Sequence, residues 1–265
     1  MRESIDLRRQ RPSGGLEASI EPVPQAGFRF SCHKGVPCFT HCCRDLDLRL
    51  TPYDLLRMRR SLQVTSTQLL EAFTDSEVDE RWGIPVVRLR MNEDAVRSCP
   101  FVTQQGCSIY ADRPGACRSY PLGRAARRAA AADSQAGGTE ERYFLVREPH
   151  CLGYREGVHW TIEAWKADQG LGIYNSMNDR WLAFVSGRAP WARYRFSPQQ
   201  WKMFYTACYS IDGFRRFVFE STLLRLVDLD EEEIARLKAS DEELLGFAFR
   251  WLSFCLFGER CIPLK

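Results

Sequence analysis

Apolar side chains recur at helical spacing in the last third of the chain. Four of them follow one another at spacings of four, four and three residues, namely Ile173, Met177, Trp181 and Phe184. This periodicity predicts the apolar face of an amphipathic helix that ends near Gly187. Thr161 is suited to cap a preceding helix, and Ser197 and Ser240 each begin a capping-box pattern ahead of an aromatic-rich run. We therefore expect a helical bundle from about Trp160 onward.

Helix and strand signals also occur in the first half of the chain. The run Thr51–Asp54 combines an N-cap threonine, a proline at the first helical position and an acidic residue in the first turn, so a helix is expected to about Arg60. Ser66 or Thr67 is expected to cap a second, short helix through Leu69, Leu70 and Phe73.

Two short runs have the composition of strands. They are Val86–Arg90 and Tyr143–Arg147, and pairing them as a hairpin would bring Cys99 and Cys151 to the same end. The expected fold class is α+β and mostly helical: a loop-rich cysteine metal-binding region with a short β-hairpin, followed by a helical C-terminal part.

Composition suggests where these regions begin and end. Residues 1–26 are rich in Arg, Pro and Gly and are expected to form a flexible tail. Residues 27–157 hold most of the cysteines, and within them residues 124–141 are expected to form an insertion loop, with a frayed Ala/Arg helix before a Gly-Gly turn. Residues 158–265 form the expected helical region, packed on the cysteine region.

Length and charge narrow the function classes. The 265 residues are 45% hydrophobic, enough for a core without disulfides, and the net charge of +3 is too small to favour a nucleic-acid or acidic-membrane partner. No apolar run is long enough to span a membrane, and the first ten residues have no apolar signal core. We expect a cytoplasmic protein, in whose reducing compartment the 11 cysteines stay free to bind metal.

Eight cysteines form the candidate metal-binding set. They are Cys32, Cys38, Cys42, Cys43, Cys99, Cys107, Cys117 and Cys151. Eight thiols allow two four-coordinate sites, and both zinc and a cubane iron-sulfur cluster take four thiolates. The chain has no C-x2-C pair, which argues against an ordinary zinc finger. Adjacent Cys42 and Cys43 point in different directions in most backbone conformations, so either they serve two neighbouring centres or one of them is not a ligand.

The other cysteines are expected to do something else. Cys208 and Cys255 share helical faces with aromatic and aliphatic residues and are expected to fill the core, whereas Cys261 has no expected role. Disulfides among the eight would need export, for which the sequence has no signal.

Basic residues lie close to the cysteines in sequence. A centre with four thiolates carries a charge of about −2, which must be balanced when it is buried. The candidate counter-charges are Arg44, Arg97, Arg113 and Arg118, although an arginine-rich chain places arginines throughout. Three histidines are adjacent to a cysteine in the sequence, namely His33, His41 and His150. Each is a candidate ligand or hydrogen-bond donor to sulfur, but a solvent-facing or merely hydrogen-bonded role is favoured over ligation.

The cysteine motifs resemble a known family. They are the run Cys32–Cys43, Cys99-Pro100-Phe101, Cys107-Ser108-Ile109-Tyr110, Arg113-Pro114 and Cys117-Arg118-Ser119-Tyr120-Pro121. Together they are similar to the zinc- or iron-chelating cysteine-cluster family, also called the CxxCxxCC or YkgJ-like family. The resemblance covers about residues 28–155, and Trp165–Trp181 resembles a helix that often follows in relatives. It implies bound zinc or iron, and a related branch, the flagellin lysine methylases, is associated with an iron-sulfur cluster.

Three functions remain open at this stage. The first is a metal-binding protein that holds zinc, iron or an iron-sulfur cluster, in one or two centres, for a structural or redox role, with a protein partner as an option. The second is an iron-sulfur-dependent protein-modifying enzyme resembling the flagellin lysine methylases. Its expected substrate-contacting residues are Tyr110, Arg113, Arg118 and Tyr120, but the radical C-x3-C-x2-C motif is missing. The third, a nucleic-acid module, rests on short arginine runs that are expected to be solvated, so we expect no nucleic-acid or membrane partner.

Overall fold

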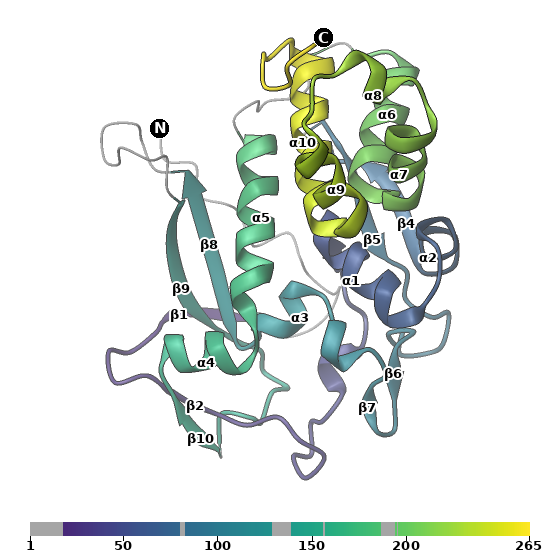
Figure 1. Ribbon diagram of the computed structural model, residues 1–265. Coiled ribbons are helices and arrows are strands. Elements are labelled where there is room, and N and C mark those ends of the chain that lie inside the picture. Colours follow the sequence, from purple (N-terminus) through teal and green to yellow (C-terminus); the bar gives the residue numbers. More distant parts are fainter. Residues whose placement is uncertain (1–17, 80–82, 129–138, 156, 187–193, 195) are drawn as a thin grey trace. The chain divides into compact units, whose positions relative to one another are not determined.

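The computed structural model describes residues 18–79, 83–128, 139–155, 157–186, 194 and 196–265 (Figure 1). Helices predominate and the sheets are small, as expected for an α+β, mostly helical fold. The chain forms two compact units, one from residues 1–49 and 88–175 and the other from residues 50–87 and 176–265. The domain boundaries expected from the sequence, at residues 26 and 157, were placed around the cysteine-rich region, and they remain a prediction.

The first unit is built on a three-stranded antiparallel sheet with the strand order β1-β9-β8. Its strands are β1 (Ser19–Pro22), β8 (Leu122–Arg128) and β9 (Thr139–Arg147). In β9, Arg147 lies opposite Ser19 and Leu145 lies opposite Leu122. Two smaller antiparallel pairs complete the strands of this unit.

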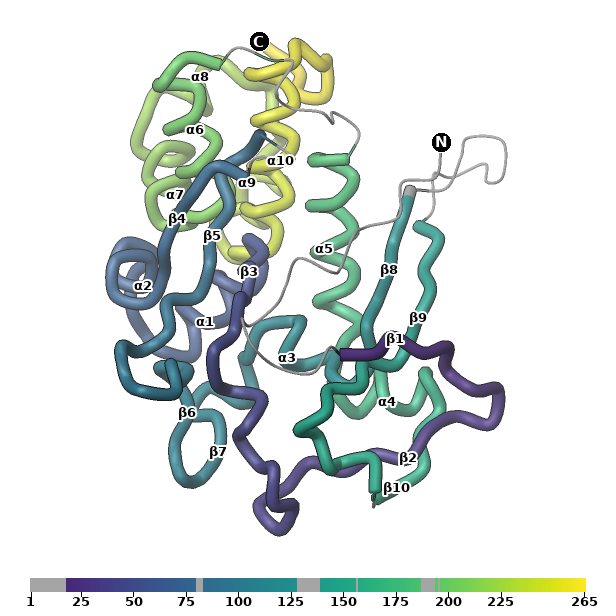
Figure 2. Tube along the Cα trace, turned by 180° about the vertical axis from the view of Figure 1, so that it is seen from behind, coloured from purple at the N-terminus to yellow at the C-terminus, as the bar shows by residue number. Residues whose placement is uncertain are grey.

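One of these pairs joins the two ends of the cysteine region, and the other lies in the middle of it. One joins β2 (Phe28–Phe30) to β10 (Val158–Trp160), which lie side by side in Figure 2. The other joins β6 (Val102–Thr103) to β7 (Gly106–Cys107). Both are too short to be stable without further contacts. The cysteine segments between them therefore depend on loop contacts for their order.

Aromatic packing holds the sheet of the first unit together. Its buried core consists of Phe28, Phe30, Leu122, Leu145, Trp165 and Leu171. Trp165 lies on α4 (Ile162–Asp168), which Thr161 caps by accepting a hydrogen bond from the Ala164 amide as expected. The Trp165 ring meets Phe28 and Phe30 edge-on at centroid distances of 6.0 and 5.7 Å. The short helix α3 (Gly115–Ser119) ends at a carbonyl that accepts a hydrogen bond from the Trp165 indole.

The sequence predicted that the strands near Val86–Arg90 and Tyr143–Arg147 pair with each other, and this prediction is wrong. Both strands exist, but β5 (Pro85–Leu89) joins β3 (Arg49–Leu50) and β4 (Thr74–Val78) in the order β3-β5-β4, and β9 pairs with β1 and β8. A connection of about ten residues lets β8 and β9 pair locally, which costs less loop entropy than joining segments more than fifty residues apart. Within β3 and within β5 the chain passes from one unit to the other.

Two segments expected to lack regular structure contain strands. The part of the expected tail that the structure describes includes β1, whose Glu21 carboxylate pairs with Arg147 at 2.6 Å. Within the expected insertion loop, the Ala/Arg run Leu122–Arg128 is a strand and not a frayed helix. Arg124 and Arg127 pair across the sheet with Glu141 and Glu140, at 2.8 and 2.6 Å. Residues 1–17 of the expected tail and 129–138 of the expected loop lie outside the described residues.

Helices make up most of the second unit. They are α1 (Pro52–Leu62), α2 (Ser66–Phe73), the C-terminal part of α5 (Leu171–Ser186), α6 (Pro198–Tyr209), α7 (Ile211–Glu220), α8 (Leu223–Leu226), α9 (Glu231–Ala239) and α10 (Asp241–Phe257). Helix α10 packs against α1, α6, α7 and α9. Ser197 forms the expected capping box, the expected N-cap Thr51 forms one as well, and Ser240 caps α10 by accepting a hydrogen bond from the Glu243 amide. None of the helices in the described residues has the length and apolarity needed to cross a membrane.

Cys208 fills the core of the second unit, as expected. It is 3% exposed on α6, and burial raises the pKa of its thiol well above the ordinary value. Because the thiolate is the reactive form, we expect iodoacetamide to leave Cys208 unmodified in the native protein and to modify it once urea unfolds this unit. Peptide mass spectrometry after quenching measures this, with the exposed Cys117 in metal-free protein as the internal control. Equal labelling of both thiols before unfolding would contradict the burial.

Candidate metal centre

A series of tight turns winds the first cysteine group into a compact loop. Backbone hydrogen bonds join Val36 to His33, Phe39 to Val36 and His41 to Cys38, each at 2.9 Å. A 3₁₀ turn, η2 (His41–Cys43), completes the series. Because each turn reverses the chain, thiols that are up to eleven positions apart in sequence come to lie close together.

Two cysteines of the second group lie at the β6–β7 hairpin: Cys107 is in β7, and Cys99 is three residues before β6. Burial raises the pKa values of the Cys99 and Cys107 thiols, and backbone amides act in the opposite direction: those of Phe101 and Val102 donate to Cys99, and that of Ile109 donates to Cys107. Amide dipoles directed at a sulfur stabilise its thiolate form. The hairpin therefore presents two sulfurs whose surroundings suit metal ligands.

Backbone and packing contacts attach this hairpin to the first loop. The Cys99 amide donates to the Cys43 carbonyl at 2.8 Å, and Arg44 and Ser98 form an isolated β-bridge. Gly106 has a φ of 111°, and a Cβ there would lie 3.1 Å from the Phe39 ring, so the first loop packs closely over the hairpin. These contacts fix Cys42 and Cys43 beside Cys99 and Cys107.

Cys151 joins the group from the far end of the region. The Leu152 amide donates to the Cys38 sulfur at 3.1 Å, and the Ser31 amide donates to the Gly153 carbonyl at 3.0 Å. The Gly153 amide also donates to the Cys151 sulfur and acts to lower the pKa of that thiol. Residues 151–153 and 31–38 are thus hydrogen-bonded to each other.

The pKa values of the thiols indicate the same grouping. Loss of hydration under the surrounding loops raises the pKa of the Cys32 thiol to about 11, although the residue keeps contact with solvent, and the neighbouring thiols of Cys42, Cys151 and Cys38 raise it further. A hydrogen bond with Cys43 is the largest cause of the raised pKa of Cys42. Because like charges raise thiol pKa values only at short range, these thiols form one cluster.

Cys42 lies at the centre of that cluster. Its charge contributes to the raised pKa of Cys32, and after the larger effect of burial it also contributes to those of Cys99, Cys107 and Cys151. A bound cation would turn this mutual repulsion into attraction and would lower the pKa of every thiol in the cluster.

The remaining expected residues have different surroundings. Cys117 is exposed on α3, and its electrostatic neighbour is Arg113. In the part of the chain that the structure describes, no group of three or more Cys, His, Asp or Glu side chains is arranged to hold an ion. The thiols affect one another's pKa values, but in the described residues their sulfurs are not arranged around a site for an ion.

Several of the histidines and arginines that lie near the cysteines in sequence contact groups other than a thiol. The rings of His41 and His150 have centroids 6.4 Å apart, and His150 pairs with Glu148 at 3.2 Å. His33 accepts a hydrogen bond from the Gly35 amide, and Arg97 pairs with Asp45 at 3.0 Å.

Tyr120 is the neighbour whose exact place the sequence did not indicate. Its hydroxyl is buried without a nitrogen or oxygen partner among the described residues, and it lies beside the Cys151 sulfur, where it acts to lower the pKa of that thiol. Burial is in turn the largest cause of the raised pKa of Tyr120, followed by the interaction with Cys151. The Cys151 sulfur is therefore the acceptor for this hydroxyl, and as a thiolate it would accept more strongly than as a thiol.

Comparison with known proteins agrees with this geometry. Residues 31–152 match the family model CxxCxxCC, described as a putative zinc- or iron-chelating domain. No curated protein and no solved structure matches the chain. The matched segment begins one residue before Cys32 and ends one residue after Cys151, so it contains all eight cysteines of the candidate set. Residues 31–152 of this chain are therefore similar to the CxxCxxCC domain family, the family that this model describes.

Proposed function

We propose that the protein binds zinc or iron through thiolates of the cysteine cluster, and that the bound metal holds the cysteine segments of the first unit in place. The observation that carries the proposal is that thiols from three separate segments, 32–43, 99–107 and 151, raise one another's pKa values while backbone amides donate to their sulfurs. Soft thiolate ligands suit zinc and iron-sulfur centres.

We further propose a division of the thiols into two neighbouring sets. The first set consists of Cys32, Cys38, Cys42 and Cys151. The charges of Cys38 and Cys42 contribute to the raised pKa values of both Cys32 and Cys151. The second set contains Cys43, Cys99 and Cys107, linked by the hydrogen bond between the Cys99 amide and the Cys43 carbonyl, with Cys117 as its fourth member. Each set offers the four ligands of a tetrahedral zinc or of a cubane.

A structural role follows from how little regular structure these segments contain. The thiols lie on a 3₁₀ turn, at a hairpin of two-residue strands, on loops and on the five-residue helix α3. Such segments gain little stability from their own hydrogen bonds, whereas structural zinc contributes on the order of 10–16 kcal/mol in small domains. Neither the family match nor the geometry of the described residues supports the enzyme hypothesis over metal binding.

Anaerobic purification followed by elemental analysis tests the proposal. We expect zinc or iron at one or two equivalents per chain. A visible absorption spectrum and an assay for acid-labile sulfide distinguish the two chemistries, because a cluster is coloured and releases sulfide whereas zinc does neither. Protein that folds, retains all its thiols and takes up neither metal on reconstitution would refute the proposal.

A further inference from the structure

Four non-glycine residues in the described part of the chain have a positive φ, namely Thr40, Asp45, Gln63 and Arg97. Such left-handed backbone favours glycine, and side chains other than those of Asn and Asp adopt it rarely. Gln63 is in an ordinary place for it, because this residue is the C-cap of α1. Each of the other three lies two residues from a cysteine of the candidate centre. The strained backbone is therefore concentrated around Cys42, Cys43 and Cys99.

Asp45 and Arg97 face each other where the two cysteine groups meet. Their φ angles are 47° and 48°, and the Asp45 amide donates to the Arg97 carbonyl at 2.9 Å. The side chains also form an ion pair, in which Arg97 Nε lies 3.0 Å from Asp45 Oδ1. Backbone and side-chain contacts thus join the two left-handed residues to each other.

This pair lies at one end of a short antiparallel ladder, and two candidate ligands lie at the other end. Arg44 and Ser98 form a β-bridge in the middle of the ladder. Beyond them, the Cys99 amide donates to the Cys43 carbonyl at 2.8 Å. The contacts of Asp45 with Arg97 therefore fix the register in which Cys43 and Cys99 meet.

Turn geometry does not account for the arginine side chain at position 97. The Arg97 amide donates to the Asp94 carbonyl at 3.0 Å, and the Asp94 carboxylate accepts from the Ser98 amide at 2.9 Å. A turn that is followed by a left-handed residue commonly has glycine at the left-handed position. Glycine would therefore satisfy this turn at a lower cost than arginine.

The stability of the ion pair does not account for it either. The side chains of Arg97 and Asp45 are 65% and 41% exposed, and an ion pair this exposed contributes little to the free energy of unfolding. Strained residues that persist in spite of their cost cluster at sites that position groups for binding.

Other arginines near the cysteines in sequence make a different kind of contact. Arg113 and Arg118 are 7% and 8% exposed, and both donate to Gln169, Arg113 to its side chain and Arg118 to its carbonyl. These contacts connect the segment after Cys107 to the end of α4. Arg97, in contrast, connects the two cysteine groups to each other.

We infer that Asp45 and Arg97 are positioning residues for the metal, because their contact sets Cys43 beside Cys99 before the metal binds. The inference rests on the proposed function and deepens it, since both cysteines belong to the second proposed set. Ligands that are held in place in advance lose less conformational freedom when the ion binds, and this raises the affinity. Both side chains act on the metal through the backbone of the cysteines.

Glycine substitutions test the inference, because glycine keeps the left-handed backbone and removes the side chain. The variants are Asp45→Gly, Arg97→Gly and the double variant. Gln63→Gly is the matched control, since it makes the same change at a helix end in the second unit. The measurements on the full chain are the Zn²⁺ affinity, from competition with a chromophoric chelator, and the unfolding temperature of the metal-free protein, from far-UV circular dichroism. If the purified protein holds iron, the iron retained per chain after dialysis against a chelator replaces the Zn²⁺ affinity.

We expect Asp45→Gly and Arg97→Gly each to bind Zn²⁺ about tenfold more weakly than the unaltered protein, the lower end of the range for groups that orient metal ligands. The metal-free variants should unfold at the same or a higher temperature, because glycine relieves the backbone strain. The double variant should bind at most about twofold more weakly than either single variant, since the two residues act as a pair. Gln63→Gly should bind Zn²⁺ within about twofold of the unaltered protein.

The outcomes distinguish this inference from the proposed function. If the unaltered protein binds metal and both single variants bind it equally tightly, the inference is wrong and the proposed function stands. Losses that add up in the double variant would also overturn the inference, because they would indicate two loops that loosen independently. A parallel fall in the unfolding temperature of the metal-free variants would assign the contact to stability alone. If the unaltered protein takes up no metal, the proposed function is wrong and this inference is wrong with it. If Arg97→Gly does not fold, Arg97→Asn takes its place, because asparagine also adopts left-handed backbone and carries no charge.

Discussion

Cys42→Ala is expected to release metal from the protein and to leave the cysteine segments of the first unit unfolded. Cys42 is the thiol whose charge reaches members of both proposed sets, and it shares a hydrogen bond with Cys43. Removing one of four thiolates leaves an incomplete tetrahedral site, and the binding energy lost is also folding energy. We expect at least one equivalent of metal to be lost.

Elemental analysis combined with limited proteolysis measures this effect. In Cys42→Ala, and in the unaltered protein after chelation, new cleavages should appear within residues 28–155 while the helices from α6 to α10 stay protected. Cys208→Ala is the matched control, because it also replaces a cysteine but lies in the core of the second unit. It should cost about 1 kcal/mol and keep the full metal content. Unchanged metal content and protease resistance in Cys42→Ala would contradict the proposed ligand.

The sequence identified the helix starts because the hydrogen bonds that stabilise a helix start join residues close together in the chain. Thr51, Thr161, Ser197 and Ser240 each bond to an amide three residues ahead, so four residues are enough to locate the helix start. Strand β1 had no such signal. Its stability comes from pairing with β9, more than one hundred residues away, and a single sequence does not show that partner.

The same distinction applies to the candidate site. The cysteines could be named from the sequence because sulfur chemistry restricts what they do in a reducing compartment. The contact between Arg113 and Gln169 could not be predicted, because 56 residues separate the two and nothing in the sequence marks that contact. The Gln169 side chain contacts the cysteine region only because α4 packs against the aromatic core of the first unit.

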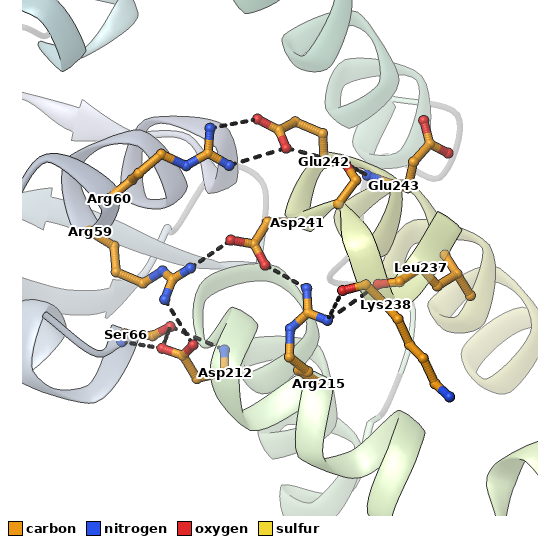
Figure 3. A network of polar contacts seen from close by, with 11 residues as sticks. Arg59, Arg60, Ser66, Asp212, Arg215, Leu237, Lys238, Asp241, Glu242 and Glu243 are labelled. Atoms are coloured by element: carbon orange, nitrogen blue, oxygen red, sulfur yellow. Dashed lines mark hydrogen bonds and ion pairs between the residues drawn. The ribbon is translucent and has the colours of Figure 1, made fainter. Parts of the chain in front are cut away.

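A polar network in the second unit leads to a second prediction, which concerns stability and does not involve the metal. Asp241, at the start of α10, lies between two arginines (Figure 3). It accepts hydrogen bonds from Arg59 on α1 and from Arg215 on α7, each at 2.6 Å. Arg59 also donates to Asp212 at 2.9 Å. Asp212 accepts from the Ser66 hydroxyl at 2.7 Å, so the network joins α1, α2, α7 and α10.

Asp241→Ala is expected to destabilise the second unit by about 3 kcal/mol. The Asp241 side chain is only 14% exposed and those of Arg59 and Arg215 are 20% and 30% exposed, so the substitution leaves two poorly hydrated cations without their shared carboxylate. Urea unfolding monitored by tryptophan fluorescence measures the loss. Glu232→Ala, which removes the exposed pair with Arg236, is the matched control and should change the free energy of unfolding by less than about 0.5 kcal/mol.

The charge of Asp241 also predicts how this stability depends on pH. Burial alone would raise the pKa of the carboxyl, but the hydrogen bond from Arg215 and the charges of Arg59 and Arg215 outweigh burial and hold it below its ordinary value of 3.8. A depressed folded-state pKa contributes stability above the unfolded-state pKa, and this contribution disappears as the pH falls through the folded-state value. The stability difference between the unaltered protein and Asp241→Asn should therefore be constant from pH 7 to about pH 5 and should shrink below about pH 4. A difference that persists unchanged at pH 2 would show that the amide disrupts packing and that the carboxylate charge contributes little.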